Sequence, residues 1–233
     1  NTPLGNSVTA TSTLQDTCIE FKKKLDTNKI KRNDLLEFLE LSEAGTKLVM
    51  RNLTKASELV KSFKQVAVDQ TSQKRREFLI NNVIHEDVAT IIPQFKKTRH
   101  QVVLELDENI NFNSYPGPLG QVIINIILNA LNHAFTEDMN GIVLISTKVV
   151  NNEQLAIVIS DNGVGMPNHV LKKIFDPFFT TKLGKGGSGL GMHIVYNFVT
   201  GLLGGDIKIS SSEGSGTKVN IILPVNAPEK QTD

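Results

Sequence analysis

The sequence is poor in several features that would point to particular protein classes. It has one cysteine, Cys18, no tryptophan, and no apolar run near the roughly 20 residues that a membrane helix needs. One cysteine excludes an internal disulfide framework and a cysteine-based metal cage, and we expect Cys18 to be a small core residue. The chain begins without an initiator methionine, a basic leader or an apolar leader, so its start is interpreted as a cut rather than a signal peptide.

The charge balance is equally uninformative about large partners. The formal net charge is +1, and lysine and arginine are mixed with acidic residues along the chain. This pattern favours neither nucleic acid nor an anionic membrane as a partner. The single cysteine suits a reducing compartment. We expect a cytoplasmic chain that itself makes no membrane contact, with any anchor of the parent protein lying outside it.

Before residue 70, the apolar residues follow helical spacing. One set recurs every seven residues at Leu4, Thr11, Cys18 and Leu25, and an interleaved set lies at Ser7, Leu14 and Phe21. After the polar stretch "DTNKIKRND", a second run carries Val49, Leu53, Ala56, Val60, Phe63 and Ala67. Two long antiparallel helices are predicted. A lone hairpin would leave its seams uncovered, so we expect residues 1–70 to form a homodimeric four-helix bundle; an arm folded on the second domain is the alternative.

After the polar segment "VDQTSQKRR", strands and helices are interleaved. Strands are predicted at "REFLI", "QVVLEL", "NINFN", "GIVLISTKVV" and "LAIVIS", with a final hairpin in "IKISSSEGSGTKVNIILP". Helices are predicted at "VIHEDVATIIPQF" and "GQVIINIILNALNHAF". The pattern indicates an α/β (α+β) two-layer sandwich over residues 73–233, preceded by a helical hairpin over residues 1–72.

The first chemical motif is "DNGVGMP", where a buried strand ends at Asp161 and a turn on Gly163 and Gly165 follows. A carboxylate at a strand end accepts hydrogen bonds and never donates, which suits the exocyclic amine of adenine. The glycines let a flat ring approach the backbone. A simple tight turn between strands is the alternative.

The second motif is "GKGGSGLGMHIV", in which glycines lead into a helix that begins near Leu190 and Gly191. Free N–H groups at such a helix start can bind phosphate. Residues 184–189 also satisfy G-x-G-x-x-G, but that dinucleotide motif should follow a buried strand early in a βαβ unit, and "FDPFFTTKL" precedes it here. A P-loop is excluded because no G-K-S or G-K-T occurs. We expect an anion-binding helix start and a mobile lid.

The third motif is the pair Asn125 and Asn129, which lie on one face of a predicted helix. Amide oxygens are suitable ligands for Mg²⁺, which takes one or two protein oxygens and completes its octahedron with phosphate and water. Buried asparagines that cap neighbouring backbone are the alternative.

Together, "NIILNALNHAF", "DNGVGMP", "FDPFF", "GGSGLGMHIV" and "GTKVNIILP" resemble, in order and spacing, the ATP-binding domain of sensor histidine kinases, the Bergerat-fold class. The resemblance covers residues 75–225. It implies that Asp161 binds adenine, that Thr217 completes the adenine pocket, and that Asn129, together with Asn125, contacts Mg²⁺ and phosphate. It also implies two glycine boxes and a lid, which comprise Gly163, Gly165, Gly187, Ser188, Gly189, Leu190, Gly191, Lys182 and Lys185.

Two features depart from the family pattern or lie at its edge. Many members carry a lysine or arginine where Asn132 stands, and His133 beside it is a candidate substitute for phosphate contact. "NTPLG" resembles the second half of a His-Glu-x-x-Thr-Pro-Leu box, which implies a phospho-accepting histidine three residues upstream of Asn1 and a kink at Pro3. Thr2 then occupies a position that in related kinases serves dephosphorylation of the regulator.

The resemblance implies a protein-histidine kinase that uses Mg-ATP, dimerises, and passes phosphate to an aspartate of a response-regulator receiver domain. Without the acceptor histidine, this chain is predicted not to label itself. A gyrase-like or Hsp90-like ATPase is the first alternative, but such relatives place a glutamate where Asn125 stands, and an amide cannot take a proton from water. A non-catalytic dimer scaffold is the second.

Overall fold

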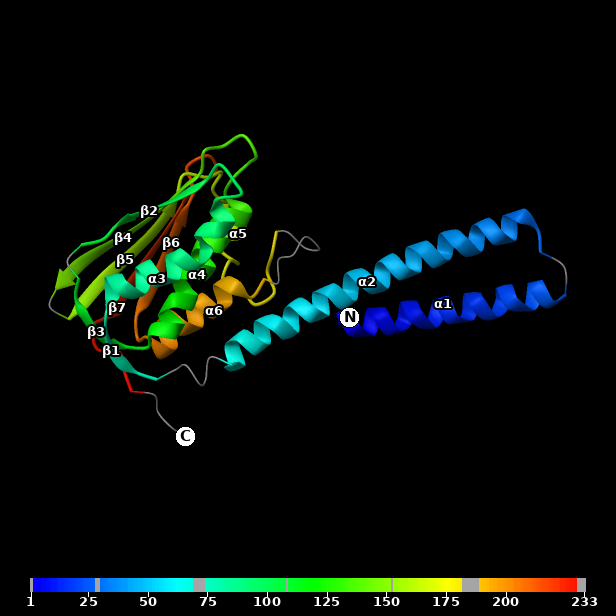
Figure 1. Ribbon diagram of the computed structural model, residues 1–233, viewed down its shortest axis with the longest axis horizontal. Coiled ribbons are helices and arrows are strands. Elements are labelled where there is room, and N and C mark those ends of the chain that lie inside the picture. Colours follow the sequence, from blue (N-terminus) through cyan, green and yellow to red (C-terminus); the bar gives the residue numbers. More distant parts are fainter. Residues whose placement is uncertain are drawn as a thin grey trace. The chain divides into compact units, whose positions relative to one another are not determined.

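The computed structural model describes residues 2–27, 30–68, 74–107, 109–151, 153–181 and 189–229, with the backbone alone at residue 55 and residues 58–68. The chain forms two compact units, one built on a helical hairpin and the other comprising Val66–Thr180 and Gly189–Asp233 (Figure 1). The predicted domain boundary between residues 72 and 73 lies within the undescribed residues 69–73 and stays a prediction.

The first unit is the predicted helical hairpin, made of α1 (Pro3–Asp26) and α2 (Arg32–Val68). Thr2 is the N-cap of α1, because its Oγ1 accepts a hydrogen bond from the Gly5 N–H at 3.2 Å. Pro3 occupies the first helical turn, where a missing N–H costs little. The kink predicted at Pro3 concerns residues that would precede Asn1, and it stays a prediction.

The closed end of the hairpin is held by charge and aromatic packing. Asp34 accepts hydrogen bonds from Lys24 Nζ at 2.6 Å and from the Lys31 backbone N–H at 2.9 Å. The hydrogen bond from Lys24 is the main reason that the pKa of Asp34 is lowered. The rings of Phe21 and Phe38 stack with their centroids 4.4 Å apart. These contacts join α1 to α2 around the turn.

The two apolar sets of α1 have different surroundings. The interleaved set is shielded from solvent, with one member buried and two half-buried, and comprises Ser7, Leu14 and Phe21. Leu14 packs on Gly45 of α2, where a Cβ would lie 2.7 Å from Leu14 Cδ2. The other set is exposed: Leu4, Thr11, Cys18 and Leu25. The prediction of a core Cys18 is therefore wrong for this chain, because Cys18 lies on the outward seam.

The predicted apolar run of α2 is only partly within the described side chains. Val49 and Ala56 are half-buried, whereas Leu53 is 43% exposed. The remaining predicted members lie outside the described side chains: Val60, Phe63 and Ala67.

The second unit is the predicted two-layer α/β sandwich. Its main sheet has the order β2-β4-β5-β7-β6, with the bounds Gln101–Glu105 (β2), Ile142–Asn151 (β4), Gln154–Asp161 (β5), Thr217–Pro224 (β7) and Asp206–Ser211 (β6). Only β2 and β4 pair in parallel within this sheet, and the other neighbours are antiparallel. One face is covered by α3 (Ile80–Phe95), α4 (Pro116–His133) and α6 (Gly191–Asn197), as Figure 1 shows.

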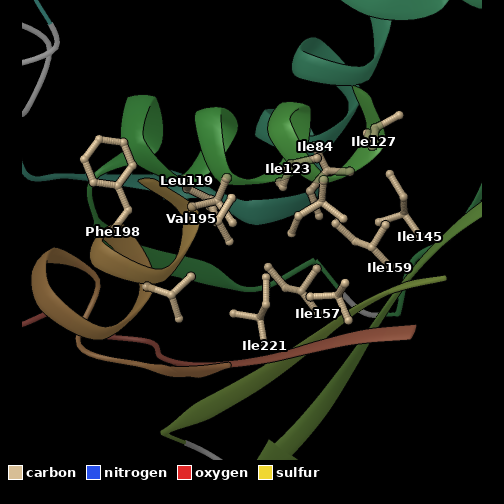
Figure 2. Close-up of a cluster of buried hydrophobic side chains, with 14 of the residues drawn as sticks. Ile84, Leu119, Ile123, Ile127, Ile145, Ile157, Ile159, Val195, Phe198 and Ile221 are labelled. Carbon is tan, nitrogen blue, oxygen red and sulfur yellow. The ribbon is translucent and has the colours of Figure 1, made fainter. Parts of the chain in front are cut away.

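The core lies between this sheet and α4. Alternate residues of β5 are buried, as expected for a strand with one face on the core. Ile157 lies opposite Ile221 in the β5–β7 register, and both side chains are fully buried below Ile123 and Ile127 of α4 (Figure 2). Burying each such side chain stabilises the fold by about 2 kcal/mol. Within the described ranges, no helix combines the length and the apolar character of a membrane span.

Three parts of this unit were not predicted in their observed form. β1 (Arg76–Leu79) and β3 (Asn111–Ser114) pair with each other in a separate two-stranded sheet. A short helix, α5 (Asn168–Leu171), follows the first glycine turn, and α6 continues into a π-helix, η1 (Phe198–Leu202). Pairing partners depend on contacts distant in sequence, which the periodicity of a single segment does not report.

A half-buried carboxyl group lies where α3 meets α4. Asp87 faces Gly120, and a Cβ on Gly120 would lie 2.2 Å from Asp87 Oδ2, so glycine makes room for the carboxyl group. Among the described residues, buried Oδ2 has no hydrogen-bond partner. Loss of water contact, and secondarily the charge of Glu86, raises the pKa of Asp87 to about 6.

Stability should therefore fall as pH rises from about 4 to about 6, because folded Asp87 keeps its proton over a range in which the unfolded chain releases it. We expect Asp87→Asn to remove this dependence and to raise the free energy of unfolding at pH 7 by about 1 kcal/mol, after allowing for solvent screening of a half-exposed group. Urea unfolding followed by tyrosine fluorescence measures this unit alone, since both tyrosines, Tyr115 and Tyr196, lie in it.

Asp138→Asn, at an exposed position, is the matched control and should leave the pH profile unchanged. A wild-type stability that stays flat between pH 4 and pH 7 would contradict the assignment of the profile to Asp87.

Candidate functional site

Asp161 joins a strand end, a glycine turn and the start of a second strand. It is the last residue of β5 and pairs with Thr217, the first residue of β7. Its Oδ1 accepts hydrogen bonds from the backbone N–H groups of Gly163 at 2.9 Å and Thr217 at 3.2 Å. Because both bonds end on Oδ1, the carboxylate keeps acceptor capacity on Oδ2.

Burial is the main influence on the charge of this carboxyl group. Loss of water contact raises the pKa of Asp161, while the two backbone hydrogen bonds act in the opposite direction. A half-buried acceptor at a strand end can recognise an amine by hydrogen bonding. It would also be left unsatisfied by a ligand that presents a carbonyl oxygen instead.

Three glycines allow the backbone around Asp161 to pack closely. A Cβ on Gly163 would lie 2.3 Å from the carbonyl oxygen of Ala134, at the end of α4. Gly165 has φ +69°, and a Cβ there would lie 2.0 Å from the carbonyl oxygen of Ser212. Gly216 has φ +71°, and its Cβ would lie 2.0 Å from the backbone oxygen of Asp161. The positions at 163, 165 and 216 therefore require glycine for steric reasons.

The hydroxyl group of Thr217 belongs to a short polar network. Ser211 Oγ lies 3.0 Å from Thr217 Oγ1, donates to the carbonyl oxygen of Gly216 at 2.8 Å, and accepts from the Met166 N–H at 2.9 Å. A serine hydroxyl has one proton, and Ser211 uses it in the hydrogen bond to the Gly216 carbonyl oxygen. Thr217 is therefore the donor in its hydrogen bond with Ser211. The lone pairs of Thr217 Oγ1 therefore remain available beside Asp161.

Asn125 and Asn129 both lie against the start of α6. Asn125 Oδ1 accepts from Gln121 Nε2 at 3.0 Å, and Asn125 Nδ2 donates to the Gly191 carbonyl oxygen at 3.4 Å. The amide group of Asn129 would lie 3.8 Å from a Cβ on Gly191. The two predicted asparagines and the predicted helix start are therefore brought together, by way of Gly191.

The second glycine box is described only at its C-terminal end. Gly189 has φ +68°, and a Cβ on it would lie 2.5 Å from the Phe178 carbonyl carbon. Leu190 is the N-cap of α6, and Gly191 is its first residue. The other predicted residues of this box and of the lid lie outside the described residues: Lys182, Lys185, Gly187 and Ser188.

Two further predicted residues lie at helix ends. His133 is the exposed last residue of α4, next to Asn132. Thr2 caps α1 in the other unit. Their proposed contacts to phosphate and to a regulator remain predictions.

Sequence reasoning missed three residues of this site: Gln121, Ser211 and Gly216. Gly216 was the easiest of these to predict, because "GSGTK" places a glycine directly before the predicted pocket threonine. Gln121 lies one helical turn before Asn125, so helix spacing places the two side chains on one face. Ser211 reaches Thr217 across the β6–β7 register, which the sequence of neither strand reveals.

Substituting Gly165 should lower the free energy of unfolding more than substituting a glycine that has similar backbone geometry but no atoms near its would-be Cβ. Gly214 also has positive φ, +77°, but no atom lies within 4 Å of its would-be Cβ. We expect Gly214→Ala to cost about 1 kcal/mol for the backbone conformation alone, and Gly165→Ala about 3 kcal/mol because a steric clash is added. Urea unfolding followed by tyrosine fluorescence compares the two variants. Equal losses would refute the steric role of Gly165.

Residues 115–227 match the family model of histidine kinase-, DNA gyrase B-, and HSP90-like ATPases. The chain is 30% identical over 186 residues to the signal transduction histidine-protein kinase AtoS of Escherichia coli strain K12, covering 79% of this chain and 29% of AtoS. It is 31% identical over 157 residues to sporulation kinase E of Bacillus subtilis strain 168, covering 66% of this chain and 20% of that kinase. The chain thus spans less than a third of either relative.

Two solved structures share the fold. The catalytic domain of histidine kinase ThkA matches with a TM-score of 0.58 and 27% identity, covering 66% of this chain and 97% of that one. Full-length ShkA, solved with AMPPNP, matches in fold over 96% of this chain and 46% of its own length, with a TM-score of 0.58 and 19% identity. The chain therefore carries the ATP-binding domain of a sensor histidine kinase, within the histidine kinase-, DNA gyrase B-, and HSP90-like ATPase family.

Proposed function

We propose that this chain is the cytoplasmic kinase core of a two-component sensor histidine kinase. Residues 73–233 bind Mg-ATP, and residues 1–72 form the dimerisation and phosphotransfer hairpin. The γ-phosphoryl group passes to a histidine nitrogen three residues upstream of Asn1, as its bond to ADP breaks and a P–N bond forms. That bond then breaks as an aspartate oxygen of a response-regulator receiver domain takes the phosphoryl group. Thr2 serves the later dephosphorylation of the regulator, in which a water molecule takes the phosphoryl group from the aspartate.

The geometry around Asp161 is the observation that carries this proposal. Its Oδ1 is occupied by two backbone donors, so its Oδ2 is left to accept from the exocyclic amine of adenine. Thr217 presents its hydroxyl oxygen at the same place. Gly163 and Gly165 leave no side chain between the turn and the flat base.

The phosphate end of the site is supported by the asparagine pair and the start of α6. Among the described residues, no three His, Cys, Asp or Glu side chains gather as a metal-binding group. Mg²⁺ commonly takes few protein oxygens and completes its coordination with substrate phosphate and water. The amide oxygen of Asn129, with Asn125 beside it, suits Mg²⁺ in that arrangement, and the bound cation would neutralise phosphate charge during transfer. We assign further phosphate contacts to Lys182, Lys185, His133 and the backbone of residues 187–191.

Asn125 favours a kinase over the two alternatives. Its amide can donate and accept hydrogen bonds but cannot act as a general base toward water, which a gyrase-like or Hsp90-like ATPase would need at this position. A non-catalytic scaffold would not require the Asp161 pocket. Positioning and charge neutralisation carry most of a phosphoryl transfer, and the residues of this chain supply both.

The hairpin supports a homodimer through its exposed apolar surface. Exposed fractions reach 60% at Leu4, 70% at Val8, 52% at Leu39 and 63% at Met50. Large apolar side chains in such numbers are unusual on the free surface of a soluble protein. A second hairpin would cover them as a four-helix bundle.

Labelling with γ-labelled ATP and Mg²⁺ tests the kinase proposal. We expect a version extended some ten residues upstream in its gene to acquire a phosphate that acid removes and alkali does not, whereas the present chain stays unlabelled. In the extended protein, Asp161→Asn should lower labelling at subsaturating ATP about 10- to 100-fold, since one amide oxygen cannot serve two backbone donors and an amine. If neither protein is labelled, ATP hydrolysis would favour the ATPase, and no nucleotide binding would favour the scaffold.

Analytical ultracentrifugation tests the dimer. The present chain should sediment as a dimer at micromolar concentration, and Leu39→Glu should shift it toward monomer because a charge would be buried in the bundle. Lys148→Glu, on an exposed strand position of the other unit, is the control and should leave the dimer intact. A wild-type monomer at this concentration would refute the proposed bundle.

A further inference from the structure

The segment that follows α5 is hydrogen-bonded to α6 through the side chain of His193. His193 lies on α6, and its Nδ1 is 3.0 Å from the carbonyl oxygen of Phe175. The rings of Phe175 and Tyr196, also on α6, lie 5.0 Å apart between centroids. One turn of α6 therefore holds both the backbone and the side chain of Phe175.

The hydrogen bonds define the form of the imidazole ring. A carbonyl oxygen can only accept, so the proton of this hydrogen bond is on Nδ1 of His193. The Nδ2 atom of Asn197 lies 3.1 Å from His193 Nε2 and donates to it in the assigned amide orientation. The neutral Nδ1–H tautomer satisfies both contacts at once.

The turn that directly follows Phe175 has an unfavourable backbone conformation. Phe178 is the only described residue other than glycine with positive φ, at +67°, a region that costs non-glycine residues about 1 kcal/mol or more. Its side chain is 60% exposed, so burial of the ring does not stabilise the turn. The turn is closed by its own backbone, since the Phe179 N–H donates to the Asp176 carbonyl oxygen at 3.2 Å. His193 adds a side-chain hydrogen bond to Phe175, the residue directly before this turn.

This turn lies against the second glycine box. Gly189 packs on the Phe178 backbone closely enough that a Cβ would lie 2.5 Å from the Phe178 carbonyl carbon. Two residues later, the Gly191 carbonyl oxygen accepts from Asn125. The contacts therefore run from Phe175 through His193 and α6, and through Phe178 and Gly189, to the asparagine pair of α4.

We propose that His193 is a positioning residue for the nucleotide site, and this inference rests on the proposed function. Its Nδ1–H holds the Phe175–Phe178 turn against α6, which keeps Gly189 and Gly191 placed for phosphate binding beside Asn125 and Asn129. His193 itself touches no phosphate.

Three substitutions of His193 separate this role from simple packing. In asparagine, the amide nitrogen is one bond from Cγ, as Nδ1 is in histidine, whereas in glutamine it is one bond further out, at the level of Nε2. His193→Asn should therefore keep the donor to Phe175, while His193→Gln and His193→Leu lose it. Packing volume alone would instead favour the glutamine and leucine variants over asparagine.

The experiment measures Mg-ADP binding by calorimetry on the full chain. We expect about tenfold weaker binding for the glutamine and leucine variants and near wild-type binding for asparagine, as for loss and retention of one hydrogen bond. His169→Leu, at an exposed position on α5, is the control and should bind as wild type. An asparagine variant as weak as leucine, or a leucine variant as tight as wild type, would overturn the proposal.

A second measurement does not involve nucleotide. Nitrogen-15 NMR of the His193 imidazole should show the Nδ1–H tautomer. The backbone amide signals of residues 174–176 and 178–179 should shift in the leucine variant but remain near wild type in asparagine. An Nε2–H tautomer, or unchanged signals in the leucine variant, would overturn the positioning role. If wild type binds no Mg-ADP, the proposed function fails, and these spectra still decide whether His193 holds the turn.

Discussion

The second unit depends on the way Asp161 closes the end of the sheet. One carboxylate oxygen accepts from the turn after β5 and from the first residue of β7, so a strand end, a glycine turn and a neighbouring strand are held together. The same arrangement directs the other oxygen away from these donors. A group that stabilises the local fold thus keeps one oxygen free of these backbone donors, and the glycines at 163, 165 and 216 let the surrounding backbone pack closely.

Asn125 likewise joins two elements of the second unit through the hydrogen bonds of one side chain. Asn125 links Gln121 to the Gly191 carbonyl, so α4 and α6 are joined by an amide rather than by a charge. An ionised side chain at this half-buried point would need a partner to offset its desolvation. A neutral amide avoids that cost and leaves the amide group of Asn129 beside Gly191, the first residue of α6.

Much of this arrangement could be predicted from short segments. The helix that carries the asparagine pair, the strand that ends at Asp161 and the final hairpin each have a clear period, and the described residues confirm them. Cys18 was placed wrongly, because a seven-residue repeat identifies an apolar seam without telling which neighbour covers it. The separate β1–β3 sheet, the Ser211 network and the contact of His193 with Phe175 join residues from different elements, and no local pattern reports them.

Residue type and spacing in the chain were enough to predict the hairpin and the sandwich, and to identify the hydrogen-bonding groups of Asp161, Asn125 and Asn129. Helix and strand periods and donor or acceptor character are properties of short stretches. Folding decided which groups meet: which oxygen of Asp161 stays open, which carbonyl Asn125 binds, and which carbonyl oxygen His193 contacts. These depend on angstrom-scale distances between elements far apart in the chain, and such distances arise only when the core packs.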